Sequence, residues 1–245
     1  MARTSMRALA LATLCATVTV AGFAQDKQPR LSQIPDPGVP ELVRMEGPYV
    51  RAAHNDEGYV VLGYRAANNS VGDPWMLLDA GIALGKGRKN QTITRDEVSL
   101  SAPDGKTVPL PSNAEYVSAN LTALEYRASM VRARELAFPA DTYARSCPDK
   151  DGSRFFYDSA ATLYAKVYPP LDGVKLNPQC RWDGTLYFPI PGGIQYGQYF
   201  LNVKFDGSRI RVPFRIMTTD EEKMLNDNYE RIKQQFEQAF PPKRK

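Results

Sequence analysis

Histidine is nearly absent from this sequence, and so are the short motifs that mark common catalytic sites. A single histidine, His54, occurs among 245 residues, which excludes every mechanism that needs two. No G-x-S-x-G sequence surrounds a serine, and no glycine-rich loop ends in the Lys-Ser or Lys-Thr pair that holds phosphates. The nearest pattern, Gly85-Lys86-Gly87-Arg88-Lys89, is a basic loop without this ending. The sequence therefore predicts neither a catalytic residue nor a bound cofactor.

Long apolar runs are also missing, with one exception near the N-terminus. A short positive region precedes the uncharged run Ala8–Val20. This run is shorter than the about 20 residues that cross a bilayer, which favours a signal peptide over a membrane anchor. Small residues at Gly22 and Ala24 fit the positions before a signal-peptidase cut. We expect residues 1–24 to be removed, no transmembrane segment, and an exported protein, periplasmic or secreted, that begins at Gln25.

Cysteine is scarce, and the interpretation of the three cysteines depends on whether the protein is exported. Cys15 lies in the expected signal peptide, which leaves Cys147 and Cys180. Two thiols in an exported protein are expected to form a disulfide, here closing a loop of about 33 residues. A metal site is the alternative, but these two cysteines have no companion histidine. The stretch Asp149–Asp158 has calcium-loop spacing without the bidentate glutamate, so no metal is predicted.

A large excess of one charge is absent once the signal peptide is removed. The whole chain has 31 basic and 27 acidic residues, a net charge of +4. Loss of Arg3 and Arg7 leaves 29 basic residues against the same 27 acidic ones, a net charge of +2. Three of the basic residues lie in the tail 241–245. A general nucleic-acid-binding protein has a larger excess of positive charge than this, so no nucleic-acid partner is predicted.

Composition divides the mature chain into segments. Residues 25–40 contain four prolines, which block helices and sheet interiors, and we expect an extended tether there. Two strands are predicted over Tyr59–Ala66 and Trp75–Leu84, with a turn-rich loop between them. Further strands are predicted over Ala161–Tyr168 and Thr185–Pro189.

Two hairpins are predicted with a defined register. In the first, a Pro-Asp-Gly turn with glycine in the left-handed position joins two short alternating runs, so that Leu100 lies opposite Val108. In the second, an Asp-Gly pair joins two longer runs, and a two-residue turn sets Val203 opposite Ile210. The same register predicts two further inward pairs, Leu201 with Val212 and Tyr199 with Phe214.

Two helices are predicted from capping boxes that precede apolar stripes. The first begins at a Ser112–Glu115 box and spans about residues 113–135, and the second begins at a Thr219–Glu222 box and occupies residues 218–240. The first stripe consists of Val117, Leu121, Leu124, Ala128 and Val131. The second stripe consists of Leu225, Tyr229, Ile232, Phe236 and Ala239. Because an isolated helix of this length is marginal in water, we expect the second stripe to dock, on its own domain rather than on a partner.

The outward face of the last hairpin is the candidate binding surface. The register sets Lys204 directly opposite Arg209, and Arg211 and Arg215 continue the same face. Like charges opposite one another destabilise a sheet mildly. Either the acidic start of the last helix, Asp220-Glu221-Glu222, neutralises this face, or the face meets a protein or an anionic envelope partner. These four basic residues are the predicted binding residues.

The closing strands resemble those of a known fold class. The stretch Gly184–Pro189 followed by the Tyr199–Ile216 hairpin resembles the last strands of immunoglobulin-like sandwiches in exported bacterial proteins. The resemblance implies a fold class and no activity. Together with the order of strands and helices, it predicts a mostly β chain: an antiparallel immunoglobulin-like β-sandwich over residues 41–217, with a mid-chain helix and a C-terminal helix.

Two functions fit these features. The first is a non-catalytic exported binding or structural module whose helices and basic hairpin face contact a partner. The second is an extracytoplasmic enzyme of unfamiliar type that acts on an envelope or extracellular polymer. The single histidine and the missing motifs favour the first function, whereas buried carboxylates clustered in a cleft would favour the second.

Overall fold

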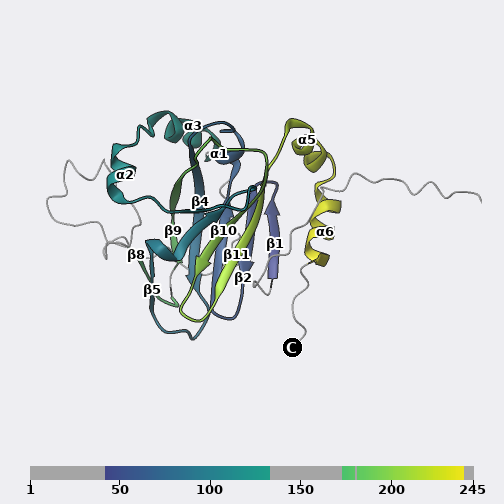
Figure 1. The fold of residues 1–245 in the computed structure, drawn as a ribbon. Helices are drawn as coiled ribbons and strands as arrows, with labels where there is room; N and C mark the ends of the chain where they lie inside the picture. The colour runs from purple at the N-terminus through teal and green to yellow at the C-terminus, as the bar shows by residue number, and fades with distance from the viewer. Residues whose placement is uncertain (1–41, 133–172, 180, 240–245) are drawn as a thin grey trace, which may run out of the picture. The chain divides into compact units, whose positions relative to one another are not determined.

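The computed structural model describes three stretches of the chain, residues 42–132, 173–179 and 181–239 (Figure 1). Several predicted features lie outside these residues, namely the signal peptide, the proline-rich tether, the cysteines Cys147 and Cys180, the strand over 161–168 and the basic tail. They stay predictions.

The described chain is mostly antiparallel β-structure with a few helices (Figure 1). The strands are β1 (Leu42–Gly47), β2 (Val50–His54), β3 (Gly58–Gly63), β4 (Trp75–Leu84), β5 (Gln91–Thr94), β6 (Val98–Ser101), β7 (Thr107–Pro109), β8 (Gly173–Leu176), β9 (Arg181–Pro189), β10 (Gly197–Lys204) and β11 (Arg209–Ile216). One sheet has five strands in the order β1-β2-β3-β4-β9, another has four in the order β11-β10-β6-β7, and β5 pairs with β8.

Short helices connect and flank these strands. They are α1 (Arg65–Asn68), the 3-10 turn η1 (Arg95–Glu97), α2 (Asn113–Ser118), α3 (Thr122–Arg132), α5 (Thr219–Asp227) and α6 (Tyr229–Ala239). In Figure 1, α5 and α6 lie on the side of β1, and α1 and α3 lie near the start of β4. No helix in the described part of the chain has the length and apolar character needed to cross a membrane.

Both predicted hairpin registers are confirmed. Leu100 pairs with Val108, and Gly105 in the turn between them has a φ of 83°. Val203 pairs with Ile210, and the same ladder sets Lys204 opposite Arg209. The inward pairs Leu201 with Val212 and Tyr199 with Phe214 are also formed. Since the apolar residues of each run alternate with polar ones, any register shifted by one residue would expose them.

One hydrophobic core includes side chains from both larger sheets. Strand β11 packs against β2 and β3, and the buried residues of the two sheets form one cluster. Phe214 on β11 is 2% exposed, and its ring centroid lies 5.2 Å from that of Tyr64 and 5.5 Å from that of Tyr199. Aromatic rings bury much apolar area, so these contacts hold β11 against the segment that follows β3.

The predicted strand over 59–66 ends earlier than expected. Strand β3 stops at Gly63, and Arg65 begins the one-turn helix α1. The turn buries Ala66 and Ala67, and the Asn68 Oδ1 atom accepts a hydrogen bond of 2.7 Å from the Met217 backbone N–H. These contacts with a residue distant in sequence explain why local composition did not predict the helix.

The predicted mid-chain helix is two helices rather than one. The Ser112–Glu115 capping box is confirmed, but α2 ends after Ser118, and Ala119 has an extended ψ of 136°. Leu121 and Leu124 are buried at 6% and 5% exposure, whereas Val117 is 63% exposed. Because the helix is interrupted, the apolar residues of α3 can pack against the core although α2 contributes no fully buried residue. Ser118 and Asn120 form helices poorly, because their side chains compete for backbone hydrogen bonds.

The C-terminal helix is also interrupted, at Asn228. The Asn228 side chain donates a hydrogen bond of 3.0 Å to the Met224 carbonyl, which closes α5 before α6 begins. The capping box lies one residue earlier than predicted, at Thr218 and Glu221. Glu222 instead accepts a hydrogen bond from the Tyr49 hydroxyl. Burial, followed by this bond to Glu222, raises the pKa of Tyr49.

The second predicted stripe packs on its own domain, as expected. Helix α6 contacts β1, and Ile232 and Phe236 are each 7% exposed. The buried Arg51 guanidinium lies 5.5 Å from the centre of the Phe236 ring and donates to backbone carbonyls of the β1–β2 turn. A cation over an aromatic face is attracted by the ring quadrupole. Ala239, by contrast, is exposed.

Candidate functional site

Three loops meet at one end of the strands. They are the turn after β2, the loop between β4 and β5, and the turn between β10 and β11. The Gly85 N–H donates 2.8 Å to the Glu57 carbonyl, and the Asp206 N–H donates 3.3 Å to the Gln91 side chain. A Cβ added to Gly58 would lie 2.4 Å from the Phe205 ring, so the loops approach one another too closely there for a larger residue.

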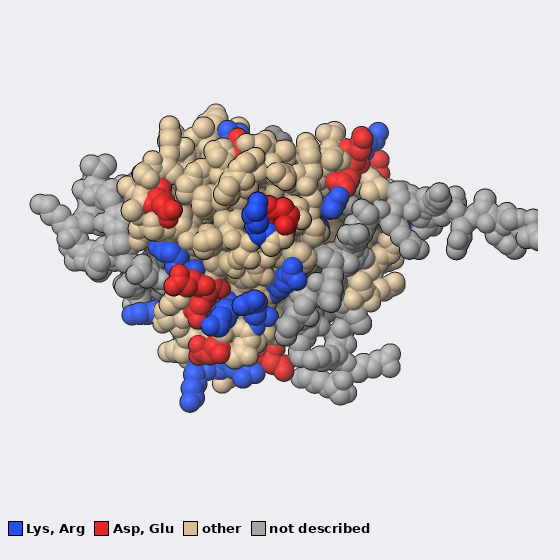
Figure 2. Space-filling view, in the orientation of Figure 1, with Lys and Arg blue, Asp and Glu red and all other residues tan. Residues whose placement is uncertain are grey.

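Five exposed cations project from these loops, and we call them the basic end. They are Lys86, Arg88, Lys89, Lys204 and Arg209. Within the described ranges none of the five forms an ion pair; Arg88 donates 2.9 Å to the Asp56 backbone carbonyl instead. Figure 2 shows blue side chains gathered toward the lower end of the molecule in this view, with some red among them.

The hairpin places its two cations together as a consequence of its register. Lys204 and Arg209 face each other at the last ladder position before the turn. Directly opposed side chains on such a pair have Cβ atoms about 5 Å apart, and like charges there cost free energy. The apolar residues on the opposite face fix this register, so burial of the core forces the two charges together.

The carboxylates at this end differ in their surroundings. Asp56 and Asp206 are exposed. Burial disfavours the charged form of Glu57, but hydrogen bonds from Ser208, the Gly207 backbone and Gln91, together with the nearby charge of Arg88, outweigh this and hold the pKa of Glu57 below its usual range. The Glu57 carboxylate is therefore ionised near neutral pH, and its oxygens already accept hydrogen bonds from groups of the loops. Within the three loops, five cations against three carboxylates leave an excess of positive charge.

The structure divides the four predicted binding residues. Lys204 and Arg209 belong to the basic end. Arg211 is half-buried, with its guanidinium 3.6 Å from the centre of the Phe200 ring. Arg215 lies six residues beyond Arg209, or about 20 Å along an extended strand. The four predicted residues therefore do not form one patch, because they lie along the strand and differ in exposure and in the groups that they contact.

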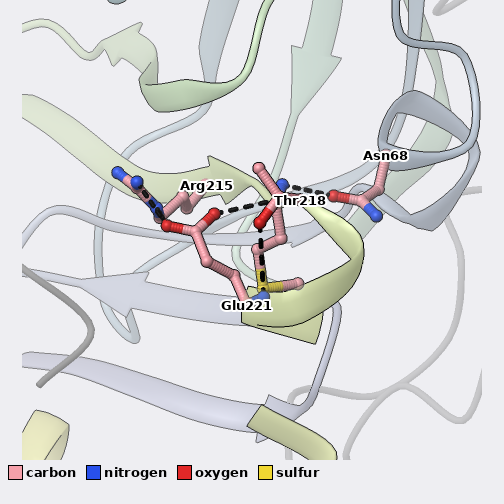
Figure 3. Close-up of polar contacts among 5 residues, drawn as sticks. Asn68, Arg215, Thr218 and Glu221 are labelled. Atoms are coloured by element: carbon pink, nitrogen blue, oxygen red, sulfur yellow. Dashed lines mark hydrogen bonds and ion pairs between the residues drawn. The ribbon is translucent and has the colours of Figure 1, made fainter. Parts of the chain in front are cut away.

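Arg215 is neutralised by the acidic start of the last helix, as the internal alternative predicted. Its Nη2 atom lies 2.6 Å from the Glu221 carboxylate (Figure 3). Burial works against ionisation of Glu221, but Arg215 and the Thr218 backbone hold the pKa of that carboxyl below its usual range. Figure 3 also shows Asn68 beside this corner, where it anchors the chain before α5. Arg215 thus has a structural partner.

His54 is the last residue of strand β2. Its side chain is half-buried, and its ring stacks on Tyr59 with centroids 5.8 Å apart. In the described residues no group of three His, Cys, Asp or Glu side chains is placed to hold a metal ion.

Large apolar side chains are exposed elsewhere and not on the three loops. Over the described ranges they are Val71, Val117, Tyr126, Met130 and Tyr196. The loops of the basic end are therefore charged and polar at their surface, a character suited to electrostatic contact rather than apolar insertion.

Sequence reasoning identified the cations of the hairpin but not those of the β4–β5 loop. The Gly85–Lys89 pattern predicts a basic loop without the ending of a phosphate-binding loop, and alone it does not indicate a binding surface. Its signal was the run of three basic residues in five, next to a strand of known direction. What could not be predicted was the contact between this loop and the hairpin turn, because these segments are more than 100 residues apart in the sequence.

Comparison of the chain with protein-family models, with curated protein sequences and with solved structures finds no match in any of the three.

Proposed function

We propose that this protein is an exported, non-catalytic binding module that contacts an anionic envelope polymer through its basic end. The observation that carries the proposal is the set of five exposed cations, drawn from two loops, that form no ion pair within the described residues. A cluster of like charges costs stability, and a polyanion that binds there removes this cost.

The chemistry of the loops supports a polymer rather than a lipid surface. Peripheral membrane binding combines cations with apolar side chains that enter the bilayer, and the exposed large apolar residues lie outside these loops. Each exposed ion contact is weak, about 0.2–1 kcal/mol, so useful affinity requires several at once. A polymer with repeated phosphate or carboxylate groups supplies them on one chain.

Two further parts of the proposal have separate support. Export to the periplasm or beyond the cell is supported by the N-terminal pattern, and a Cys147–Cys180 disulfide follows from it. The immunoglobulin-like sandwich class is supported by antiparallel pairing throughout the described sheets and by the core that the two larger sheets share.

Replacing Lys204 and Arg209 together by alanine is expected to weaken binding of long-chain polyphosphate, measured by titration calorimetry at low salt, by about fivefold or more. The expectation follows from the loss of two exposed ion contacts. Wild-type affinity is also expected to fall steeply between about 0.05 and 0.3 M salt, because exposed charges are screened. The protein used is the chain from Gln25 to Lys245.

Two matched variants control this experiment. Lys223→Ala removes an exposed cation from α5, away from the three loops, and is expected to leave the affinity unchanged. Replacement of Lys243, Arg244 and Lys245 by glutamine tests the basic tail. If the tail variant loses all binding while the Lys204/Arg209 variant keeps it, the basic end is not the binding surface.

A further inference from the structure

The Glu57 carboxylate lies at the centre of the contacts that join the three loops. Its two oxygens accept hydrogen bonds from the Gly207 N–H at 2.9 and 3.1 Å, from the Ser208 hydroxyl at 2.7 Å, and from the Gln91 amide at 3.1 Å. One side chain therefore holds the hairpin turn between Lys204 and Arg209 and the start of β5, which follows the basic loop.

A second layer of hydrogen bonds fixes Glu57 itself. The Asn55 Oδ1 atom accepts from the backbone N–H groups of Glu57 and Gly58, each at 2.9 Å. The Asn55 amide also donates 2.8 Å to the Ser208 hydroxyl, which in turn donates to Glu57. Carboxylate, hydroxyl and amide thus form one connected network, and such networks restrain the groups that they join.

The charge of Glu57 and its contacts act in opposite directions on an anionic ligand. The Glu57 carboxylate lies between the two loops that carry the five cations, and the nearby charge of Arg88 helps to keep the pKa of Glu57 low, yet within the described residues Glu57 forms no ion pair with any of the five. As a charge alone it would repel an anion from this end. Through its hydrogen bonds it holds the two loops that carry the cations in one arrangement.

We infer that Glu57 is a positioning residue of the basic end, which aligns the hairpin cations with those of the β4–β5 loop for simultaneous contact with one polyanion. The inference rests on the proposed function. Without the network the five cations remain, but on two loops that move independently. A multivalent ligand then pays the entropy of ordering them when it binds.

Loss of the negative charge is expected to strengthen the binding of a polyanion, whereas loss of the hydrogen bonds is expected to weaken it, so two variants can separate these effects. Glu57→Gln and Asp56→Asn make the same change in formal charge at neighbouring positions. Asp56 is exposed, and among the described residues only its backbone carbonyl forms hydrogen bonds. Asp56→Asn is expected to bind long-chain polyphosphate as tightly as the wild type or up to about twofold more tightly, because a negative charge is lost.

Glu57→Gln is expected to bind long-chain polyphosphate about three- to tenfold more weakly than the wild type, because its amide nitrogen cannot accept the hydrogen bonds of the second oxygen. Gln91→Ala, which removes one donor to Glu57 without a change in charge, is expected to weaken binding in the same direction. Thermal melts confirm that each variant is folded at the temperature of the titration.

The outcomes separate the inference from the proposed function. If wild-type protein does not bind polyphosphate at low salt, the proposed function is wrong. If the wild type binds and Glu57→Gln binds as tightly as Asp56→Asn, the proposed function stands and the positioning role is overturned. Weaker binding by both Glu57→Gln and Gln91→Ala, with tight binding by Asp56→Asn, supports the inference.

Discussion

Phe214→Ala is expected to lower the free energy of unfolding by about 3–5 kcal/mol, the usual cost of removing a buried aromatic ring. The ring is 2% exposed and contacts Tyr64 and Tyr199. Its loss leaves a cavity at the place where β11 packs against the neighbouring sheet, and the rigid strands on both sides limit how far the cavity can collapse. Urea denaturation followed by tyrosine and tryptophan fluorescence measures the change.

Phe200→Ala is the matched control for this variant. Phe200 lies on β10 of the same hairpin, but on its outward face, where it is only half-buried beneath Arg211. The same substitution is therefore expected to cost about 1 kcal/mol or less. Equal losses for the two variants would contradict the assignment of inward and outward faces.

Phe236→Ala is expected to lower the free energy of unfolding by about 2–4 kcal/mol. Phe236 is 7% exposed and packs on the protein's own β-structure beneath the Arg51 guanidinium. Its loss removes apolar burial and one cation–π contact. Thermal and urea denaturation measure the effect.

Gln235→Ala controls for changes in helix propensity. Gln235 is exposed on the same helix, so its replacement is expected to change the stability by less than about 0.5 kcal/mol. An unchanged melting temperature for Phe236→Ala would show that α6 does not contribute to the stability of the monomer, and its stripe would then be a surface for another protein.

The elements that sequence reasoning predicted well are those whose signal is local. Strand β4 has the bounds that its composition predicted, and the hairpin β10–β11 has the register that its Asp-Gly turn and alternating residues predicted. In both cases the hydrophobic pattern and the turn residues favour the same structure. The buried faces of α3 and α6 were also predicted from their periodicity.

The elements that were missed depend on contacts distant in sequence. The breaks at Ala119 and Asn228 are set by where each half of the helix docks, which periodicity does not show. Strand β5 is short and needs its partner to form: it pairs with β8, more than 80 residues later. Short strands gain most of their stability from pairing and burial rather than from intrinsic propensity.

The candidate site shows the same division. The opposition of Lys204 and Arg209 follows from the hairpin register and was predicted. The addition of the β4–β5 loop follows from the hydrogen bonds of Glu57 and Gln91, which join segments far apart in the chain. The alternation of the strand places Arg215 on the same face as Lys204 and Arg209. Its ion pair with Glu221 depends on how α5 begins after the strand, which the alternation does not predict.

Hydrogen–deuterium exchange with and without long-chain polyphosphate tests most directly whether the basic end is the binding surface. We expect slower exchange at low salt in the peptides that cover residues 54–58, 85–91 and 204–209, and loss of this protection at high salt as the charges are screened. Peptides from α2, α3 and α6 are expected to exchange as they do in the free protein. Protection confined to those helices, or no protection at any salt concentration, would contradict the proposal.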